Sequence, residues 1–149
     1  MRKRFKKLGV TIGAVSVMAL SLAIPAQASG GGVGEPTTAV ADGRTVSSIG
    51  NYGMTRNPDG SRTVVYQCNT LATGDVASTT SNCSLQVSGS QVSGGSVTLP
   101  GPTSEFVGTT TITTSGAVRL CYSGSAQFIV NSLTLANSQM CTRANVAIP

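Results

Sequence analysis

Apolar and small polar residues alternate in short stretches along most of the chain that follows residue 43. A period of two places successive side chains on opposite faces of a β-strand, so one face of each strand can turn toward a core. No stretch of this region shows the longer period of an amphipathic helix. The clearest apolar faces are Val64, Tyr66 and Cys68, then Cys83, Leu85 and Val87, and then Val118, Leu120 and Tyr122.

Turn-forming residues separate these stretches. The clearest signal is Pro58-Asp59-Gly60, because proline presets φ for a type I turn and Gly60 can take the left-handed position after it. We also expect a polar loop over residues 71–82 and a turn over residues 123–125. The predicted strands are residues 45–55, 62–70, 83–88, 96–99, 105–114, 117–122, 126–135 and 140–148.

This arrangement predicts an all-β fold: a small, disulfide-stapled antiparallel β-sandwich, immunoglobulin-like or related, of roughly seven or eight short strands. The sandwich domain is expected over residues 44–149. The preceding residues 29–43 hold four glycines between positions 30 and 34, and a proline follows at position 36. Such a composition predicts a flexible segment, in which only Thr37, Thr38, Ala39 and Val40 have the character of a strand.

The first 28 residues have the three parts of a secretory signal peptide. A basic start, residues 2–7, is followed by an uncharged apolar stretch, residues 8–24, and then by Ala26-Gln27-Ala28. This order predicts cleavage between Ala28 and Ser29 and a secreted, extracellular protein, with a signal of bacterial character. The apolar stretch is interrupted by glycine and serine, so we expect no stable membrane anchor after processing.

The positive charge of the whole chain comes from this signal. Of the ten basic residues, five precede residue 8, and the remaining five arginines match the five acidic residues. The net charge after cleavage is therefore near zero. This balance does not support a basic surface for nucleic acid, so we expect no nucleic-acid partner.

The four cysteines are expected to form two disulfides, because an exported chain with an even number of cysteines typically oxidises them in pairs. Alternation suggests the pairing, since Cys68 and Cys83 lie on the apolar faces of their strands. Cys121 and Cys141 instead lie on polar faces, beside Arg119 and Arg143. We therefore predict Cys68–Cys83 inside the sandwich and Cys121–Cys141 outside it.

The residue types needed for common catalytic sites are missing. After residue 28 the chain has no His and no Lys, which excludes Ser-His-Asp, Cys-His and Schiff-base chemistry. The five carboxylates are spread singly, without the clustered ligands of a calcium or zinc site. We therefore expect no enzyme activity, no metal and no cofactor.

The function favoured by these observations is a secreted binding module, an adaptor subunit of an extracellular assembly with a protein partner. We favour this function because the chain combines a rigid domain with a loose N-terminal segment. An extended segment can add a strand to the sheet edge of another protein. The partner contact is therefore expected at Thr37, Thr38, Ala39 and Val40.

Two alternatives stay open. A proteinase inhibitor presents a loop held rigid by a nearby bridge, and candidate residues are Leu71 and Met140, although the alternation of Met140 with Val146 places Met140 in the core. The second alternative is a β-sandwich that binds a small ligand or a glycan. The absence of Trp argues against a glycan site, because sugars stack on aromatic rings.

A small exported sandwich with two short-range disulfides resembles the apoproteins of the neocarzinostatin family in architecture and size. That resemblance implies a carrier of an apolar enediyne chromophore. The paired cysteines here are 15 and 20 residues apart, which differs from the tighter loops of that family, and aromatic residues are fewer. No site residue is therefore assigned from the resemblance.

Overall fold

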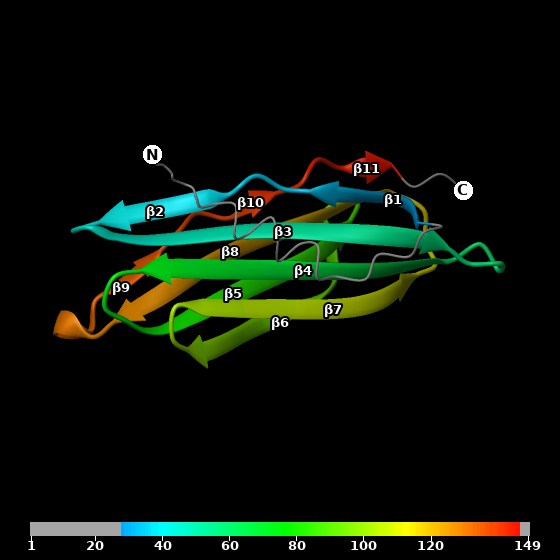
Figure 1. Ribbon diagram of the computed structural model, residues 1–149. Coiled ribbons are helices and arrows are strands. Elements are labelled where there is room, and N and C mark those ends of the chain that lie inside the picture. Colours follow the sequence, from blue (N-terminus) through cyan, green and yellow to red (C-terminus); the bar gives the residue numbers. More distant parts are fainter. Residues whose placement is uncertain (1–27, 147–149) are drawn as a thin grey trace.

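The structure is a computed structural model that describes residues 28–146, and it is a sandwich of two antiparallel β-sheets (Figure 1). Apart from the short 3-10 turn η1 (Val130–Ser132), the regular structure of these residues is all strand. The predicted all-β sandwich is thus confirmed. Within the same residues, no helix is long and apolar enough to span a membrane. The predicted signal segment lies outside the described residues except for Ala28.

The first sheet has β3 and β4 at its centre. β7 borders β4, while β1 and β2 pair in succession along the other side of β3. The β1 segment lies opposite residues 51–55 of β3, and β2 lies opposite residues 44–48. The strands of this sheet are β1 (Ala28–Val33), β2 (Thr37–Ala41), β3 (Arg44–Arg56), β4 (Arg62–Thr73) and β7 (Thr103–Ile112).

The second sheet has β5 and β8 at its centre. β6 borders β5, while three short strands pair along the other side of β8. Across the sandwich, β8 packs over β3 and β5 packs over β4. The strands of this sheet are β5 (Val76–Val87), β6 (Ser90–Pro100), β8 (Ala117–Phe128), β9 (Thr134–Ala136), β10 (Met140–Cys141) and β11 (Asn145–Val146).

The hairpin expected at Pro58-Asp59-Gly60 joins β3 to β4. The Asn57 N–H donates to the Ser61 carbonyl over 2.8 Å, and the Gly60 N–H donates to the Asn57 carbonyl over 3.0 Å. Gly60 has a φ of +89°, in the left-handed region that glycine adopts without strain. The Asp59 carboxylate accepts from the Ser61 N–H and hydroxyl, which lowers the pKa of Asp59.

Two predicted turns are strands in the structure. Residues 71–82, expected to form a loop, belong mostly to β4 and β5, and the chain reverses between them at Gly74 and Asp75. Residues 123–125 lie inside the continuous strand β8. The physical reason is that part of the sandwich interior is polar, so serine and threonine occupy inward positions that a sequence pattern assigns to loops.

The N-terminal segment also differs from the expectation. Composition predicts that residues 29–43 are flexible, but the structure places most of them in β1 and β2, paired to β3. Thr37 is buried, and its hydroxyl donates to the Ser138 carbonyl over 2.8 Å. The backbone groups of β1 and β2 find their hydrogen-bond partners on the edge of β3. The composition of residues 29–43 gives no information about this pairing. This segment is thus part of the sandwich.

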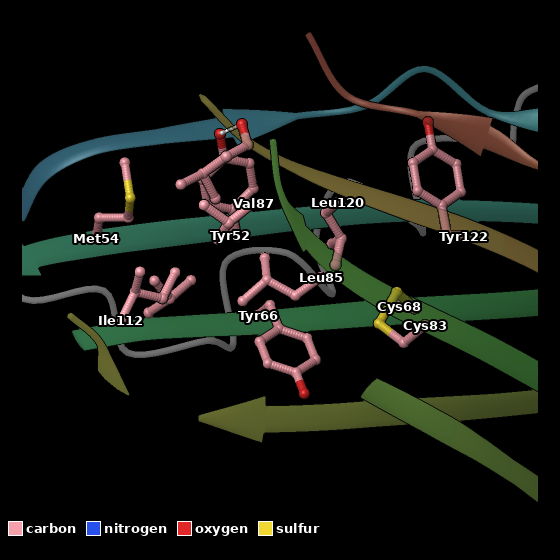
Figure 2. Packing of buried hydrophobic residues seen from close by; sticks show 12 residues of the cluster. Tyr52, Met54, Tyr66, Cys68, Cys83, Leu85, Val87, Ile112, Leu120 and Tyr122 are labelled. Atoms are coloured by element: carbon pink, nitrogen blue, oxygen red, sulfur yellow. Dashed lines mark hydrogen bonds between the residues drawn. A yellow bond between two sulfur atoms is a disulfide. The ribbon is translucent and has the colours of Figure 1, made fainter. Parts of the chain in front are cut away.

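An apolar cluster fills the larger part of the interior. It lies between β3 and β4 on one side and β5 and β8 on the other, with Leu85 and Leu120 at its centre (Figure 2). The disulfide Cys68–Cys83 crosses this cluster and joins β4 to β5. The members of the cluster are Tyr52, Met54, Val64, Tyr66, Cys68, Cys83, Leu85, Val87, Ile112, Val118, Leu120 and Tyr122.

A belt of hydroxyl groups separates this cluster from a smaller one that contains Val46 and Phe128. The Thr70 hydroxyl lies 2.8 Å from those of Ser48 and Ser81, and the Ser81 hydroxyl lies 3.0 Å from that of Ser104. We call Ser48, Thr70, Ser81 and Ser104 the hydroxyl belt; all four are buried. Each hydroxyl therefore finds its partner within the sandwich interior.

Candidate functional site

An open groove of about 550 Å³ runs along the side of the sandwich where β1 meets β10. The two strands belong to different sheets, so the groove marks a seam at which the sheets are not joined by pairing (Figure 1). We call it the seam groove. Its lining residues are Gly31, Gly32, Val33, Gly34 and Glu35 on one wall, and Met140, Cys141, Thr142, Arg143 and Ala144 on the other.

The β1 wall presents backbone groups to the groove. The Gly34 N–H donates to the Gly50 carbonyl over 2.8 Å, which fixes the side of β1 that faces β3. Because successive residues of an antiparallel strand alternate in direction, the N–H and carbonyl of Val33 point away from β3. The Val33 side chain is 72% exposed, so at this position the wall offers outward-facing backbone groups together with an apolar side chain.

The β10 wall is arranged in a similar way. The Thr142 N–H donates to the Leu120 carbonyl over 2.8 Å, and the Thr142 hydroxyl accepts from the Leu120 N–H. The same alternation turns the backbone groups of Cys141 away from β8, whereas Arg143 follows the strand and its carbonyl accepts from the Thr142 hydroxyl over 3.3 Å. Cys141 lies opposite Cys121 in β8 and is bonded to it, so the disulfide fastens this short wall to the second sheet.

Tyr122 packs behind the β1 wall of the groove and is not among the residues that line it. Its ring comes so close to β1 that a Cβ at Gly34 would lie 2.1 Å from the phenol oxygen. A Cβ at Gly50 would lie 2.6 Å from the ring. The phenol donates to the carbonyl of Glu35, which ties the first sheet to the second at this point. Glycine at position 34 is therefore required by packing, and a larger residue would displace the tyrosine.

The Tyr122 phenol stays protonated through the neutral range. Burial raises its pKa to about 12, and the nearby Glu35 carboxylate adds to this rise. The hydrogen bond to the Glu35 carbonyl acts in the opposite direction and is the smaller influence. The phenol therefore remains the hydrogen-bond donor to the Glu35 carbonyl.

A second, shallower hollow of about 280 Å³ lies on the outer face of the second sheet. It is lined by amides and hydroxyls, among them Asn82, Ser84 and Ser123, with no aromatic ring in its lining. The Asn82 amide donates to the Ser123 hydroxyl over 3.3 Å. Residues 28–146 contain no group of three or more His, Cys, Asp or Glu that could hold a metal ion.

The structure places the predicted cysteine pairs as expected. Cys68–Cys83 lies inside the sandwich and Cys121–Cys141 joins neighbouring strands of the second sheet. Alternation was sufficient here because β4, β5 and β8 run without a bulge at the cysteines.

The residues considered for an inhibitor loop are not on a shared loop. Leu71 lies within β4, paired with Ser47 and Thr103, and is half-buried. Met140 is 38% exposed at the seam groove instead of lying in the core. The expected alternation from Met140 to Val146 fails because β10 and β11 are separate two-residue strands.

The residues expected to contact a partner are Thr37, Thr38, Ala39 and Val40, and they form most of β2. They lie next to β1 in the chain but do not line the seam groove. Sequence reasoning missed the groove residues Val33, Glu35 and Arg143. One available signal was Pro36, since a proline between two β-forming stretches fits an interrupted strand at a sheet edge.

Comparisons of this chain with protein-family models, with curated proteins and with solved structures found no match, so its groove is interpreted from geometry alone.

Proposed function

We propose that this chain is a secreted, non-enzymatic protein-binding module that takes an extended segment of an extracellular protein into the seam groove. The observation that supports the proposal is the pair of strand edges that face the groove, at Val33 on one wall and at Cys141 on the other. An extended chain placed there would form backbone hydrogen bonds to one or both edges, which is the basis of recognition by strand addition.

The lining of the groove favours a peptide over a small apolar ligand. Pockets for small ligands are rich in aromatic and aliphatic side chains, which bury most of the ligand. Here three of the ten lining residues are glycine, and the large exposed apolar side chains are those of Val33 and Met140. Because glycine has no side chain, the groups that the β1 wall offers to a ligand are mainly the outward-facing backbone groups of Val33.

The site proposed here replaces the contact expected at Thr37 to Val40. In the structure those residues pair with β3, and the Asn137 amide donates to the Thr37 carbonyl over 3.2 Å. Releasing them for a partner would break these bonds. Secretion itself is supported by the predicted signal peptide and by the two disulfides, which persist in oxidising compartments.

A test compares two substitutions at one position. The oxidised domain, residues 29–149, is used to select binders from a displayed library of random peptides, and affinities of the selected peptides are measured. Val33→Pro removes the N–H that faces the groove, and we expect it to weaken binding by about tenfold, the value of one good hydrogen bond. Val33→Ala keeps the N–H and is expected to cost less than about threefold.

The circular dichroism spectrum and melting temperature of both variants serve as controls for folding. Equal affinities for the two variants and the unchanged domain would refute recognition through the β1 edge. Selected ligands that bind only outside the groove, or self-association of the domain through β1, would also contradict the proposal.

A further inference from the structure

We infer that the segment bound in the seam groove is charged at both ends, with a basic residue beside Glu35 and an acidic residue beside Arg143. This inference rests on the proposed function and adds the direction of the bound chain. Glu35 and Arg143 are the charged residues among those that line the groove.

The two charges lie toward opposite ends of the groove. In Figure 1, β1 runs in the opposite direction to β10 and β11. Glu35 follows the end of β1, and Arg143 follows the end of β10. The Glu35 carbonyl lies at the Tyr122 phenol of β8. Thr142 is bonded to Leu120 and Asn145 lies opposite Val118, so Arg143 lies farther along β8, between these two levels. The groove is therefore negative toward one end and positive toward the other.

Both charged side chains are available to a ligand. Glu35 and Arg143 are exposed, and within residues 28–146 neither side chain takes part in a hydrogen bond or salt bridge. By contrast, the Arg44 guanidinium is engaged by the Asp75 carboxylate at 2.7 Å. A bound segment would supply the missing partners without breaking an existing pair.

The charges matter because the backbone alone discriminates poorly between the two directions of a bound strand. A strand between antiparallel walls is antiparallel to one wall and parallel to the other, whichever way it runs. Antiparallel pairing is slightly more favourable per residue, and β1 is longer than β10. This favours a segment antiparallel to β1, in which the basic residue precedes the acidic residue.

Charge pairs at an exposed site contribute little affinity, about 0.2–1 kcal/mol each. Their main effect is selectivity, because the wrong direction brings like charges together at both ends. We therefore expect the polarity of the ligand to change affinity by about tenfold, and expect most of this difference to disappear at high salt.

The experiment uses three synthetic peptides with the same centre, Thr-Val-Thr-Val. One carries an N-terminal Lys and a C-terminal Glu, the second has these two exchanged, and the third has Gln at both ends. Dissociation constants are measured for the oxidised domain in about 0.02 M and 0.5 M NaCl. We expect the first peptide to bind about tenfold more tightly than the second at low salt, with the neutral peptide between them.

The reversed variant Glu35→Lys/Arg143→Glu should bind the second peptide more tightly than the first. A control, Glu105→Lys/Arg119→Glu, reverses exposed charges on strands outside the groove and should keep the original preference. Because these side chains are bonded to Gln67 and Gln86, the melting temperature of the control is measured as well. Glu35→Gln provides a milder variant with only one charge removed, and it should reduce the preference.

The outcomes separate this inference from the proposed function. Equal binding of the two charged peptides, still weakened by Val33→Pro, would refute the polarity and leave strand addition in place. A preference that the reversed variant does not invert would also refute it. If none of the peptides binds at millimolar concentration and no library member is selected, both the polarity and the proposed function are wrong.

Discussion

The two parts of the sandwich interior are held together in different ways. In the apolar cluster Leu85 has no exposed surface, and it packs among aliphatic and aromatic side chains without directional contacts (Figure 2). In the hydroxyl belt Ser81 is equally buried, but its neighbours are the hydroxyls of Thr70 and Ser104 at hydrogen-bond distance. Burial alone therefore does not distinguish the two regions; the chemistry of the contacts does.

This difference teaches what each region contributes. Apolar packing is strong, but it permits small shifts of one strand relative to another because the contacts are not directional. A hydrogen-bonded network requires particular positions of the strands whose side chains form it. The belt joins β3, β4, β5 and β7. It continues through Asn137, whose amide donates to the Ser48 hydroxyl over 3.0 Å and whose side-chain carbonyl accepts from the Gly124 N–H over 2.8 Å. The belt thus fixes the alignment of the two sheets near β2 and β9.

The largest effect is expected in the apolar cluster. Leu85→Ala should lower the free energy of unfolding by about 2–5 kcal/mol, because it removes buried methyl groups and leaves a cavity. Guanidinium denaturation of the oxidised domain measures this. Val107→Ala, at a side chain that is 51% exposed, is the control and should change the value by less than about 0.5 kcal/mol. A loss at Leu85 no greater than at Val107 would contradict the importance of this cluster.

The second effect concerns the bridge that crosses the same cluster. Replacing both cysteines, Cys68→Ala/Cys83→Ala, should cost about 3 kcal/mol, since the unfolded chain gains the freedom of the opened loop. The measurement compares the double variant with the unchanged domain in guanidinium, without reductant. An unchanged unfolding midpoint would mean that the bridge adds nothing to the apolar contacts around it.

A smaller effect is expected in the hydroxyl belt. Thr70→Val keeps the shape of the side chain but removes the hydroxyl that contacts Ser48 and Ser81, and should cost about 1–3 kcal/mol. The double variant Thr70→Val/Ser81→Ala should cost less than the sum of the two single variants, because they share one network. Additive losses in urea denaturation would show that the hydroxyls act independently, as apolar neighbours do.

The smallest expected effect is a pH dependence of stability, and it concerns Tyr122 at the edge of the apolar cluster. In the unfolded chain the Tyr122 phenol ionises with the ordinary tyrosine pKa of 10.0, whereas the folded phenol, with a pKa of about 12, keeps its proton. The folded state therefore loses stability relative to the unfolded state as pH rises from 10 to 12. Tyr122→Phe lacks this part of the loss, so the stability difference between the two proteins should shrink between about pH 10 and pH 12. A constant difference would contradict the raised pKa.

The comparison also explains which features could be predicted from the sequence. Alternation identified the strands around Tyr66 and Leu85 and both cysteine pairs, because their inward positions are apolar or cysteine. The same rule misplaced residues 71–82 and 123–125, whose inward positions belong to or border the belt. There Gly124 is required by the close approach of Ser48 and Thr70, since a Cβ would lie 2.3 Å from both hydroxyls.

Sequence patterns do not predict the seam groove, for a related reason. Its walls are built from backbone edges, and those edges exist only because β3 and β8 are long enough to pair with several short strands. A glycine-rich run looks the same whether it is loose or paired. Whether such a run is loose or paired depends on its partner strand, which is distant in the sequence.

The positions of the disulfides have a mechanical consequence. If the domain is pulled from its two ends, force passes directly through Cys68–Cys83 and Cys121–Cys141. Residues 69–82 and 122–140 then carry no load and cannot be drawn out, although each would otherwise add about 3.5 Å when extended. A tethered copy under tension would therefore extend only by the residues outside these two loops, and the loops would be released only if the disulfides were reduced.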